Sequence, residues 1–179
     1  RHPASYLLAG ELNSRALEGF AHATPLALLR EDVRQRSVFY STTNGTVALK
    51  RAEGAGHVYA AALVNAAATV RHVVHHHPDQ TVLIACSGSA SSFNLEDFYG
   101  AGCFVSLFRE AGGNRFEFSD AALAAEIMFL QRDALQCLSL ARVGRGMLAR
   151  QRDDEVRFAA RQSCFDVVPK LAGGVLRPV

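Results

Sequence analysis

The stretch LIACSGSASSFNLEDFYGAG, residues 83–102, decides how the fold is interpreted, because an apolar run passes there through small polar residues into a helical segment. A continuous rather than alternating apolar run is typical of a strand covered on both faces. Small residues let a backbone approach a ligand closely, and two acids, Glu96 and Asp97, open the helix. The stretch therefore predicts a strand, a loop suited to a ligand, and a helix.

Similar apolar runs extend this pattern along the chain. Alternation of strands and helices favours an α/β fold with a mainly parallel sheet, helices on both faces and a helical C-terminal third. No internal repeat or linker divides residues 1–179, which fits a single domain. We expect strands at residues 6–9, 37–41, 57–63 and 81–86, with a weaker one at 165–168, and helices at 46–52, 65–76, 95–110, 121–131, 133–142 and 153–161.

The composition excludes several classes of protein. Apolar residues make up 49% of the chain and charged residues 20%, as in an ordinary globular protein. The net charge of +2, with both signs scattered, gives no argument for nucleic acid or an anionic membrane surface. No apolar run approaches the roughly 18 residues that a membrane span requires. The 4 cysteines form no CxxC motif, so we expect free thiols in the cytoplasm.

The octapeptide FYSTTNGT, residues 39–46, is the first candidate site, because it lies where a strand ends and a helix begins. Backbone N–H groups and the positive end of the helix dipole point into one spot at such a junction. Hydroxyl groups of Thr43 and Thr46 and the turn-forming Asn44 and Gly45 suit a phosphate or sulfonate site. An ordinary helix cap followed by an Asn-Gly turn explains the same residues, and both interpretations stay open.

Residues around the quoted stretch form the second candidate. The loop with Ser87 and Gly88 leaves the expected sheet at the edge where ligands of open α/β sheets collect. Glu96 and Asp97, with Glu11 at the end of the first apolar run, could hold Mg²⁺, which needs only one or two carboxylates. The helix dipole alone also favours acids in a first helical turn, so this pattern has a structural explanation too.

The run HVVHHHP, residues 72–78, is a weaker candidate for metal binding. It falls at a predicted helix C-terminus, where histidines interact favourably with the dipole and are usually solvated.

Taken together, segments in chain order resemble the 2-phosphosulfolactate phosphatase family. The resemblance covers nearly the whole chain and rests on LLAGE at 7–11, STTNGT at 41–46, FNLEDFYGAG at 93–102, FSDAALAAE at 118–126 and VVPKL at 167–171. It implies an α/β phosphatase that depends on Mg²⁺ and serves coenzyme M biosynthesis. The implied substrate is a three-carbon phosphoester that carries a sulfonate and a carboxylate.

Within this resemblance, we assign roles to individual residues from their charge and hydrogen-bonding chemistry. A substrate with several negative charges requires amide and hydroxyl donors and a divalent cation. We expect the anion to bind at Thr43, Asn44, Gly45, Thr46, Ser87 and Gly88; acid–base catalysis to fall to Glu96 and Asp97; and the metal to lie on Glu11 and Asp97.

Departures from the family pattern leave alternatives open. Family members are longer and usually carry a strand and an acidic, Arg-containing loop before the segment that matches Tyr6, so we expect an N-terminal portion to be missing. Val47 stands where an Arg is common, and Ser163 where an Asp is usual. The chain is therefore either an active phosphatase or a diverged non-catalytic homologue that binds a small anion. A shortened sheet would expose an edge, which leaves room for a homodimer.

Overall fold

The computed structural model describes residues 6–13, 15–20, 24–89 and 92–179. The strands are β1 (Tyr6–Leu12), β2 (Arg15–Ala16), β3 (Ser37–Ser41), β4 (Val58–Tyr59), β5 (Pro169–Ala172) and β6 (Val175–Pro178). The helices are α1 (Pro25–Leu29), α2 (Gly45–Ala52), α3 (Ala66–His76), α4 (Leu95–Gly112), α5 (Asp120–Leu130), α6 (Ala134–Leu140), α7 (Arg142–Leu148) and α8 (Asp153–Ala159), with 3₁₀ turns η1 (Leu63–Asn65) and η2 (Gly113–Arg115).

The strands form two small sheets, so the prediction of a mainly parallel sheet is wrong. The first sheet has the order β2-β1-β3, in which β1 and β3 are parallel, from Tyr6 opposite Ser37 to Gly10 opposite Ser41. The second has the order β4-β5-β6 and is antiparallel throughout. The pair β1–β3 is the one parallel pair among the described strands, although the α/β class and the helical C-terminal third are confirmed.

The missing parallel strands have a common physical cause. Residues 81–86 pair with no strand within the described chain, and the Leu83 side chain is 87% exposed. Of the run at 57–63 only Val58 and Tyr59 pair, with β5, and residues 165–168 form no strand. A segment with high strand propensity forms a strand only where a neighbouring strand supplies hydrogen bonds and packing partners.

The helices follow the sequence prediction closely, except that α1 and α7 are not predicted. Ser119 and Asp133 cap α5 and α6 with their side chains, as the positions of these residues before apolar segments predict. The helix α7 was not expected, because Gly144 and Gly146 suggested a loop. Gly144 is required there by packing, since a Cβ at this residue would lie within 1.8 Å of the carbonyl oxygen of Leu138.

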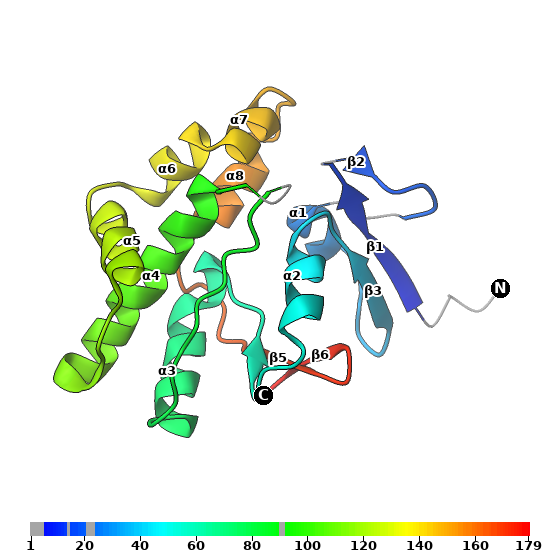
Figure 1. The fold of residues 1–179 in the computed structure, drawn as a ribbon. Coiled ribbons are helices and arrows are strands. Elements are labelled where there is room, and N and C mark those ends of the chain that lie inside the picture. The colour runs from blue at the N-terminus through cyan, green and yellow to red at the C-terminus, as the bar shows by residue number, and fades with distance from the viewer. Residues whose placement is uncertain (1–5, 14, 21–23, 90–91) are drawn as a thin grey trace.

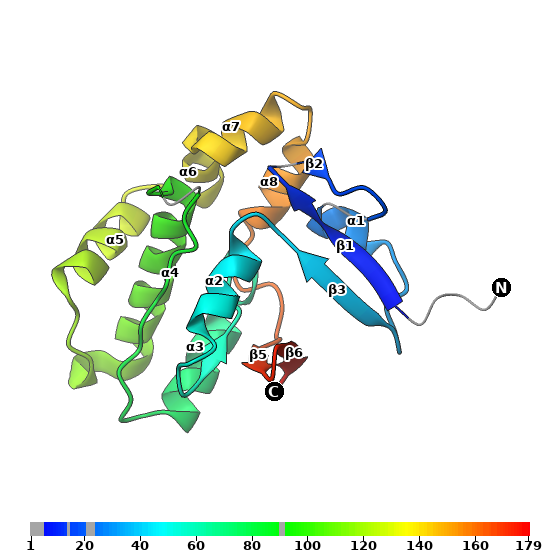
Figure 2. The ribbon, with the colours of Figure 1, turned by 45° about the vertical axis from the view of Figure 1, so that its right-hand side comes forward.

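The hydrophobic core lies among the helices, away from the β1–β3 sheet. Tyr99 and Cys103 of α4, Val70 of α3 and Cys137 of α6 are the largest of its fully buried side chains. Figures 1 and 2 show α3 to α8 gathered on one side of the molecule and β1, β3 and α1 on the other, with α2 between them. No helix in the described ranges is long and apolar enough to cross a membrane.

Ser163, where the family usually has Asp, has a structural role. Its hydroxyl oxygen accepts a hydrogen bond from the backbone N–H of Ala67 at 3.1 Å, and its own N–H donates to the carbonyl of Leu63 at 2.8 Å. The side chain thereby satisfies one of the N–H groups that the first turn of α3 leaves unpaired. The serine therefore performs the acceptor function that an aspartate could also provide.

Candidate active site

The first candidate loop is fixed by the close parallel pairing of β1 and β3. Gly10 lies so near Ser41 that a Cβ would stand 2.0 Å from the Ser41 carbonyl oxygen, at a φ of +152°. A side chain is excluded at this position, and the close approach brings the end of β1 against the loop that follows β3. Glu11 is the next residue, and its carboxylate contacts that loop.

Glu11 is held by Thr43 through two hydrogen bonds. The backbone N–H of Thr43 donates to Oε1 at 2.8 Å, and the Thr43 hydroxyl donates to Oε2 at 2.9 Å. The same hydroxyl oxygen accepts a hydrogen bond from the N–H of Asn13 at 2.7 Å. The arrangement orients the Glu11 carboxylate and commits both donors of Thr43 to it.

Thr46 is engaged within the chain as well. The backbone N–H of Thr42 donates to the Thr46 hydroxyl and the N–H of Thr46 to the Thr42 hydroxyl, each at 3.1 Å, while the Thr46 hydroxyl donates to the Thr42 carbonyl at 3.0 Å. Asn44 precedes Gly45, the first residue of α2, so the helix begins one residue before the predicted start at Thr46. The expected anion site is thus a strand-to-helix turn whose threonine donors serve Glu11 and the turn itself.

The second candidate loop is organised around Asp97. Its Oδ2 accepts hydrogen bonds from the Ser87 hydroxyl at 3.0 Å and from the Gly88 N–H at 2.7 Å. Gly88 has a φ of +69°, which a residue with a side chain rarely adopts. The other oxygen of Asp97, Oδ1, accepts no hydrogen bond within the part of the chain that the structure describes, so it can bind a ligand.

An arginine that the sequence did not single out reaches the same loop. The guanidinium of Arg142, at the start of α7, donates to the Ser89 hydroxyl. Ser89 and Ser92 exchange backbone hydrogen bonds of 3.1 and 3.0 Å, and residues 90–91 lie outside the described chain. An exposed cation therefore stands next to the loop that orients Asp97.

The two loops lie at one end of the molecule. Figures 1 and 2 both show the end of β1, the start of α2 and the start of α4 at the upper end, with α7 beside them. The cavity described below is lined by neither loop, and the carboxylates of Glu11 and Asp97 belong to separate hydrogen-bond networks. The elements that carry the two loops therefore lie near each other, whereas a shared anion site formed by both loops stays a prediction.

Glu96 points elsewhere, although it adjoins Asp97 in the chain. It lines a cavity of about 150 Å³ between α4, α6, α7 and α8, together with Glu155. Glu155 is buried, and its Oε2 accepts a hydrogen bond from the Leu26 N–H at 3.3 Å. Burial raises the pKa of Tyr40, and the negative charges of Glu11 and Glu155 raise it further. Sequence reasoning missed Glu155, because the run DDE at 153–155 resembles acids placed only for a helix dipole.

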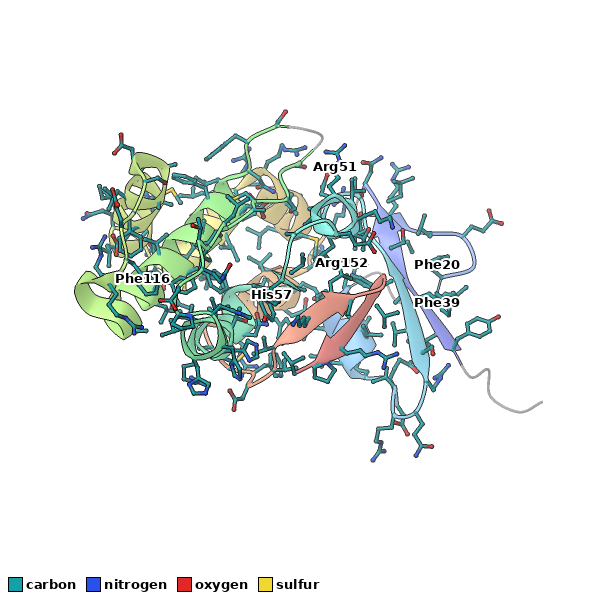
Figure 3. All side chains as sticks on the ribbon, turned by 60° about the horizontal axis from the view of Figure 1, so that its bottom comes forward. Phe20, Phe39, Arg51, His57, Phe116 and Arg152 are labelled. Carbon is teal, nitrogen blue, oxygen red and sulfur yellow. The ribbon has the colours of Figure 1, made fainter. Side chains whose placement is uncertain are left out.

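The histidine run forms a cluster with Tyr59 and no metal site. The Tyr59 hydroxyl hydrogen-bonds Nε2 of His72 at 3.1 Å and Nε2 of His77 at 2.7 Å. The ring of His57 stacks on His77 with centroids 4.0 Å apart, and Figure 3 shows His57 beside the β5–β6 hairpin. Throughout the part of the chain that the structure describes, no three His, Cys, Asp or Glu side chains are grouped so that they could hold a metal ion.

The acids of the two loops still fit Mg²⁺, because this ion keeps several water ligands and binds proteins through one or two carboxylates plus substrate oxygens. Asp97 is the better suited of the two, since Oδ1 is available while Oδ2 is held in place. Both oxygens of Glu11 already accept hydrogen bonds from Thr43.

Comparison with known proteins identifies the family. A family profile described as 2-phosphosulpholactate phosphatase matches residues 1–174. Three relatives carry the name "Probable 2-phosphosulfolactate phosphatase". The protein from a Synechocystis species is 33% identical over 174 residues, covering 95% of this chain and 72% of the relative. The protein from Nostoc punctiforme is 34% identical over 172 residues (91% and 68%), and that from Caldanaerobacter subterraneus is 28% identical over 176 residues (97% and 71%). The chain therefore belongs to the 2-phosphosulpholactate phosphatase family.

Proposed function

We propose that the chain is a Mg²⁺-dependent phosphatase that hydrolyses 2-phosphosulfolactate, or a similar small anionic phosphoester, to the alcohol and phosphate. Family membership supports the reaction class. The observation that carries the assignment of the site is the carboxylate of Asp97, which is held through one oxygen by Ser87 and Gly88 while the other accepts no hydrogen bond from the described residues. A preorganised carboxylate of this kind costs little reorganisation when the reaction proceeds.

Asp97 and Glu11 are the residues that would hold Mg²⁺. When bound, the cation offsets the charge of the phosphoryl oxygens and orients the phosphoester. The hydroxyl of Ser87, which already donates to Asp97, keeps the carboxylate in a single orientation. Thr43 does the same for Glu11.

Arg142 and the start of α2 provide the positive environment for the substrate. The guanidinium of Arg142 can form paired hydrogen bonds with a phosphate or carboxylate. In this proposal it takes over the charge that Val47 lacks at the third residue of α2. Asn44 and Gly45 lie at the positive end of the α2 dipole, where an anionic group is stabilised.

The second candidate function, binding of a small anion without turnover, rests on Val47, which stands where a basic residue is common in the family, and it would have to use few of the donors at the turn. The N–H and O–H donors of Thr43 and Thr46 all serve acceptors within the chain. A phosphate at this turn would have to displace Glu11 or the Thr42–Thr46 pair, or rely on neighbouring amides.

Phosphate release separates the two functions. The purified chain is assayed with 2-phosphosulfolactate and with an aryl phosphate, in Mg²⁺ and in chelator, beside the Asp97→Asn variant and the control Asp120→Asn. Asp120 is an exposed acid in the first turn of α5, so its variant reproduces the charge change at the start of another helix. Asparagine at 97 keeps an oxygen for Ser87 and Gly88, so the fold should be unaffected.

We expect turnover that requires Mg²⁺ and falls about 100-fold or more in Asp97→Asn, with Asp120→Asn near wild type. Equal rates in the two variants would remove Asp97 from the site. A folded wild-type chain that binds phosphate and releases none from either substrate would support the anion-binding function instead.

A further inference from the structure

Basic side chains gather on one face of the β4–β5–β6 sheet, at the end of the molecule opposite the two candidate loops (Figures 1 and 2). Tyr59 of β4 lies opposite Lys170 of β5, and Lys170 lies opposite Arg177 of β6. Residues that lie opposite each other in an antiparallel pair project from the same face, with Cβ atoms about 4.5–5.5 Å apart. Tyr59, Lys170 and Arg177 therefore form a row across three strands.

The C-terminal end of α3 adds histidines to this row. Nε2 of His72 and Nε2 of His77 lie 3.1 and 2.7 Å from the Tyr59 hydroxyl oxygen. The Lys170 ammonium lies 5.9 Å from the centre of the Tyr59 ring, and the ring of His57 stacks on His77 beside the β5–β6 hairpin (Figure 3). We call this set the basic cluster; its members are His57, Tyr59, His72, His77, Lys170 and Arg177.

The charges within the basic cluster repel one another. Burial lowers the pKa of His72 and His77, and the positive charges of neighbouring histidines and of Lys170 lower it further, whereas no negative charge among the described residues contributes to either shift. Neither Lys170 nor Arg177 forms a salt bridge with another described residue. The cluster therefore contains no acid that neutralises it.

The acids of the adjoining segments do not supply this missing charge. Asp166 is bound by Arg71 at 2.6 Å. Glu53, whose Oε1 would lie 3.5 Å from a Cβ at Gly174 in the hairpin turn, is bound by Lys50 at 2.5 Å. Asp79, two residues after His77, is exposed and is not among the charges that act on that ring.

We propose that the basic cluster binds a small oxyanion with two negative charges, of the class of sulfate or a phosphate monoester. Like charges directly opposite each other destabilise a pair of strands, and natural sequences break such local rules mainly at functional sites. Lys170 and Arg177 supply two positive charges at neutral pH, and a guanidinium forms paired hydrogen bonds with oxyanions of this class. A dianion between these two side chains would offset their repulsion.

The histidines couple this binding to pH. The Tyr59 hydroxyl has one proton, so it donates to one of the two Nε2 atoms and accepts from the other. When His72 and His77 are both protonated, both Nε2 atoms donate to the Tyr59 oxygen, and the hydroxyl proton can be donated to the anion. The other titratable side chains of α3 near this point, His75 and His76, are exposed and add positive charge on protonation. Anion affinity should therefore rise as the pH falls.

This inference does not depend on the proposed function, because none of the cluster residues belongs to either candidate loop. The two sites can also be distinguished in an experiment, since an anion at the loops would leave the rings of His72 and His77 undisturbed. Their ring resonances thus report on the basic cluster alone.

The experiment titrates sulfate into the full chain at constant ionic strength and in chelator, and follows the histidine ring resonances by nuclear magnetic resonance. Sulfate is the probe because its charge, unlike that of phosphate, does not change between about pH 5.5 and 7.5, where histidine titrates. Lys170→Gln and Arg177→Gln are compared with the wild type and with Arg115→Gln. Arg115 is an exposed arginine of η2, outside the cluster. Circular dichroism checks that each variant is folded.

We expect saturable shifts of the His72 and His77 resonances in the wild type and in Arg115→Gln, with affinity about five- to tenfold lower in Lys170→Gln and in Arg177→Gln. If Lys170→Gln fails to fold, Arg177→Gln, at an exposed position, decides the outcome. Equal affinity in Arg177→Gln and Arg115→Gln would overturn the proposal, as would shifts that never saturate, which indicate charge screening only.

A second titration tests the coupling to pH. Lowering the pH from about 7.5 to 5.5 should strengthen sulfate binding several-fold in the wild type. The same increase is expected in His75→Gln, whose ring contacts His76, and not in the double variant His72→Gln/His77→Gln, in which calorimetry replaces the ring resonances. An increase of equal size in the double variant would refute the role of these two histidines.

Discussion

Replacing Gly102 with alanine tests how closely α4 packs on α5, the contact that supports the helix carrying Glu96 and Asp97. A Cβ at Gly102 would lie 2.1 Å from the carbonyl oxygen of Ala125 and 2.8 Å from the Cβ of Phe129. The nearest atom belongs to helix backbone, which cannot rotate away as a flexible side chain can. The two helices must therefore separate or distort.

The magnitude follows from two opposing effects. Overpacking a core costs about 1–3 kcal/mol, and a backbone clash belongs at the upper end of this range. Alanine in place of glycine inside a helix returns about 1 kcal/mol. The net expectation is a loss of about 2 kcal/mol in the free energy of unfolding. Gly100, two residues earlier in α4, has no atom within 4 Å of its Cβ position, so Gly100→Ala should instead gain about 1 kcal/mol.

Urea unfolding followed by far-ultraviolet circular dichroism gives both values. The two variants should shift the midpoint in opposite directions with the same slope, because neither changes the surface exposed on unfolding. Thermal midpoints should then differ by about 6–12 °C, at roughly 2–4 °C per kcal/mol for a chain of this size. A Gly102→Ala protein as stable as Gly100→Ala would contradict the close approach of α4 and α5.

Two further predictions concern α3, namely the histidines near its C-terminal end and Ser163, which contacts its first turn. Burial lowers the pKa of His72 and His77, and the positive charges of Lys170 and neighbouring histidines lower it further. As the pH falls, the unfolded chain therefore takes up protons before the folded chain does. The free energy of unfolding should be greatest above about pH 6.5 and decrease as the pH drops below it. Melting temperatures measured across this range should show this decrease in the wild type and not in a variant in which both histidines are replaced by Gln. Ser163→Ala should cost about 1 kcal/mol by removing the acceptor for the Ala67 N–H, whereas Ser163→Asp should stay near wild type.

The sequence predicted local structure better than it predicted pairing. Helices α3, α4 and α5 follow from apolar periodicity and from caps such as Ser119, which act within a few residues. The run at 81–86 has the composition of a buried strand, yet Leu83 is exposed and no described strand lies against it. Composition indicates that a segment could be a strand, but the hydrogen bonds belong to a partner that local sequence does not specify.

The exposed apolar residues of β3 also show that the composition of a segment does not by itself determine its burial. Phe39 is 59% exposed, and Figure 3 shows it on the side of the β1–β3 sheet away from the helices. Its ring contacts Tyr6 of β1 edge-on, with centroids 6.0 Å apart. A continuous apolar strand predicts cover on both faces, whereas Val38, Phe39 and Tyr40 are all exposed.

The residues of the candidate site likewise fall into those that the sequence predicts and those that it does not. Glu11, Asp97, Ser87 and Gly88 were selected because they follow apolar runs or open helices, and the structure joins Asp97 to the last two. Local sequence patterns do not identify Arg142 as a site residue. It contacts Ser89 from α7, a helix that is not predicted because it contains Gly144 and Gly146. Contacts across more than 50 residues depend on how α7 packs, and no local pattern encodes that.

The neighbours Glu96 and Asp97 show why adjacent acids cannot be given one role from sequence. Successive side chains of an α-helix diverge by about 100°, since 3.6 residues complete a turn. Asp97 accordingly meets the loop at 87–88, while Glu96 enters the cavity with Glu155. A loss of activity in a Glu96 variant would therefore not by itself make Glu96 a catalytic residue, because the substitution also alters the support of Asp97. Only a variant set that measures cation binding and turnover separately can assign the two carboxylates.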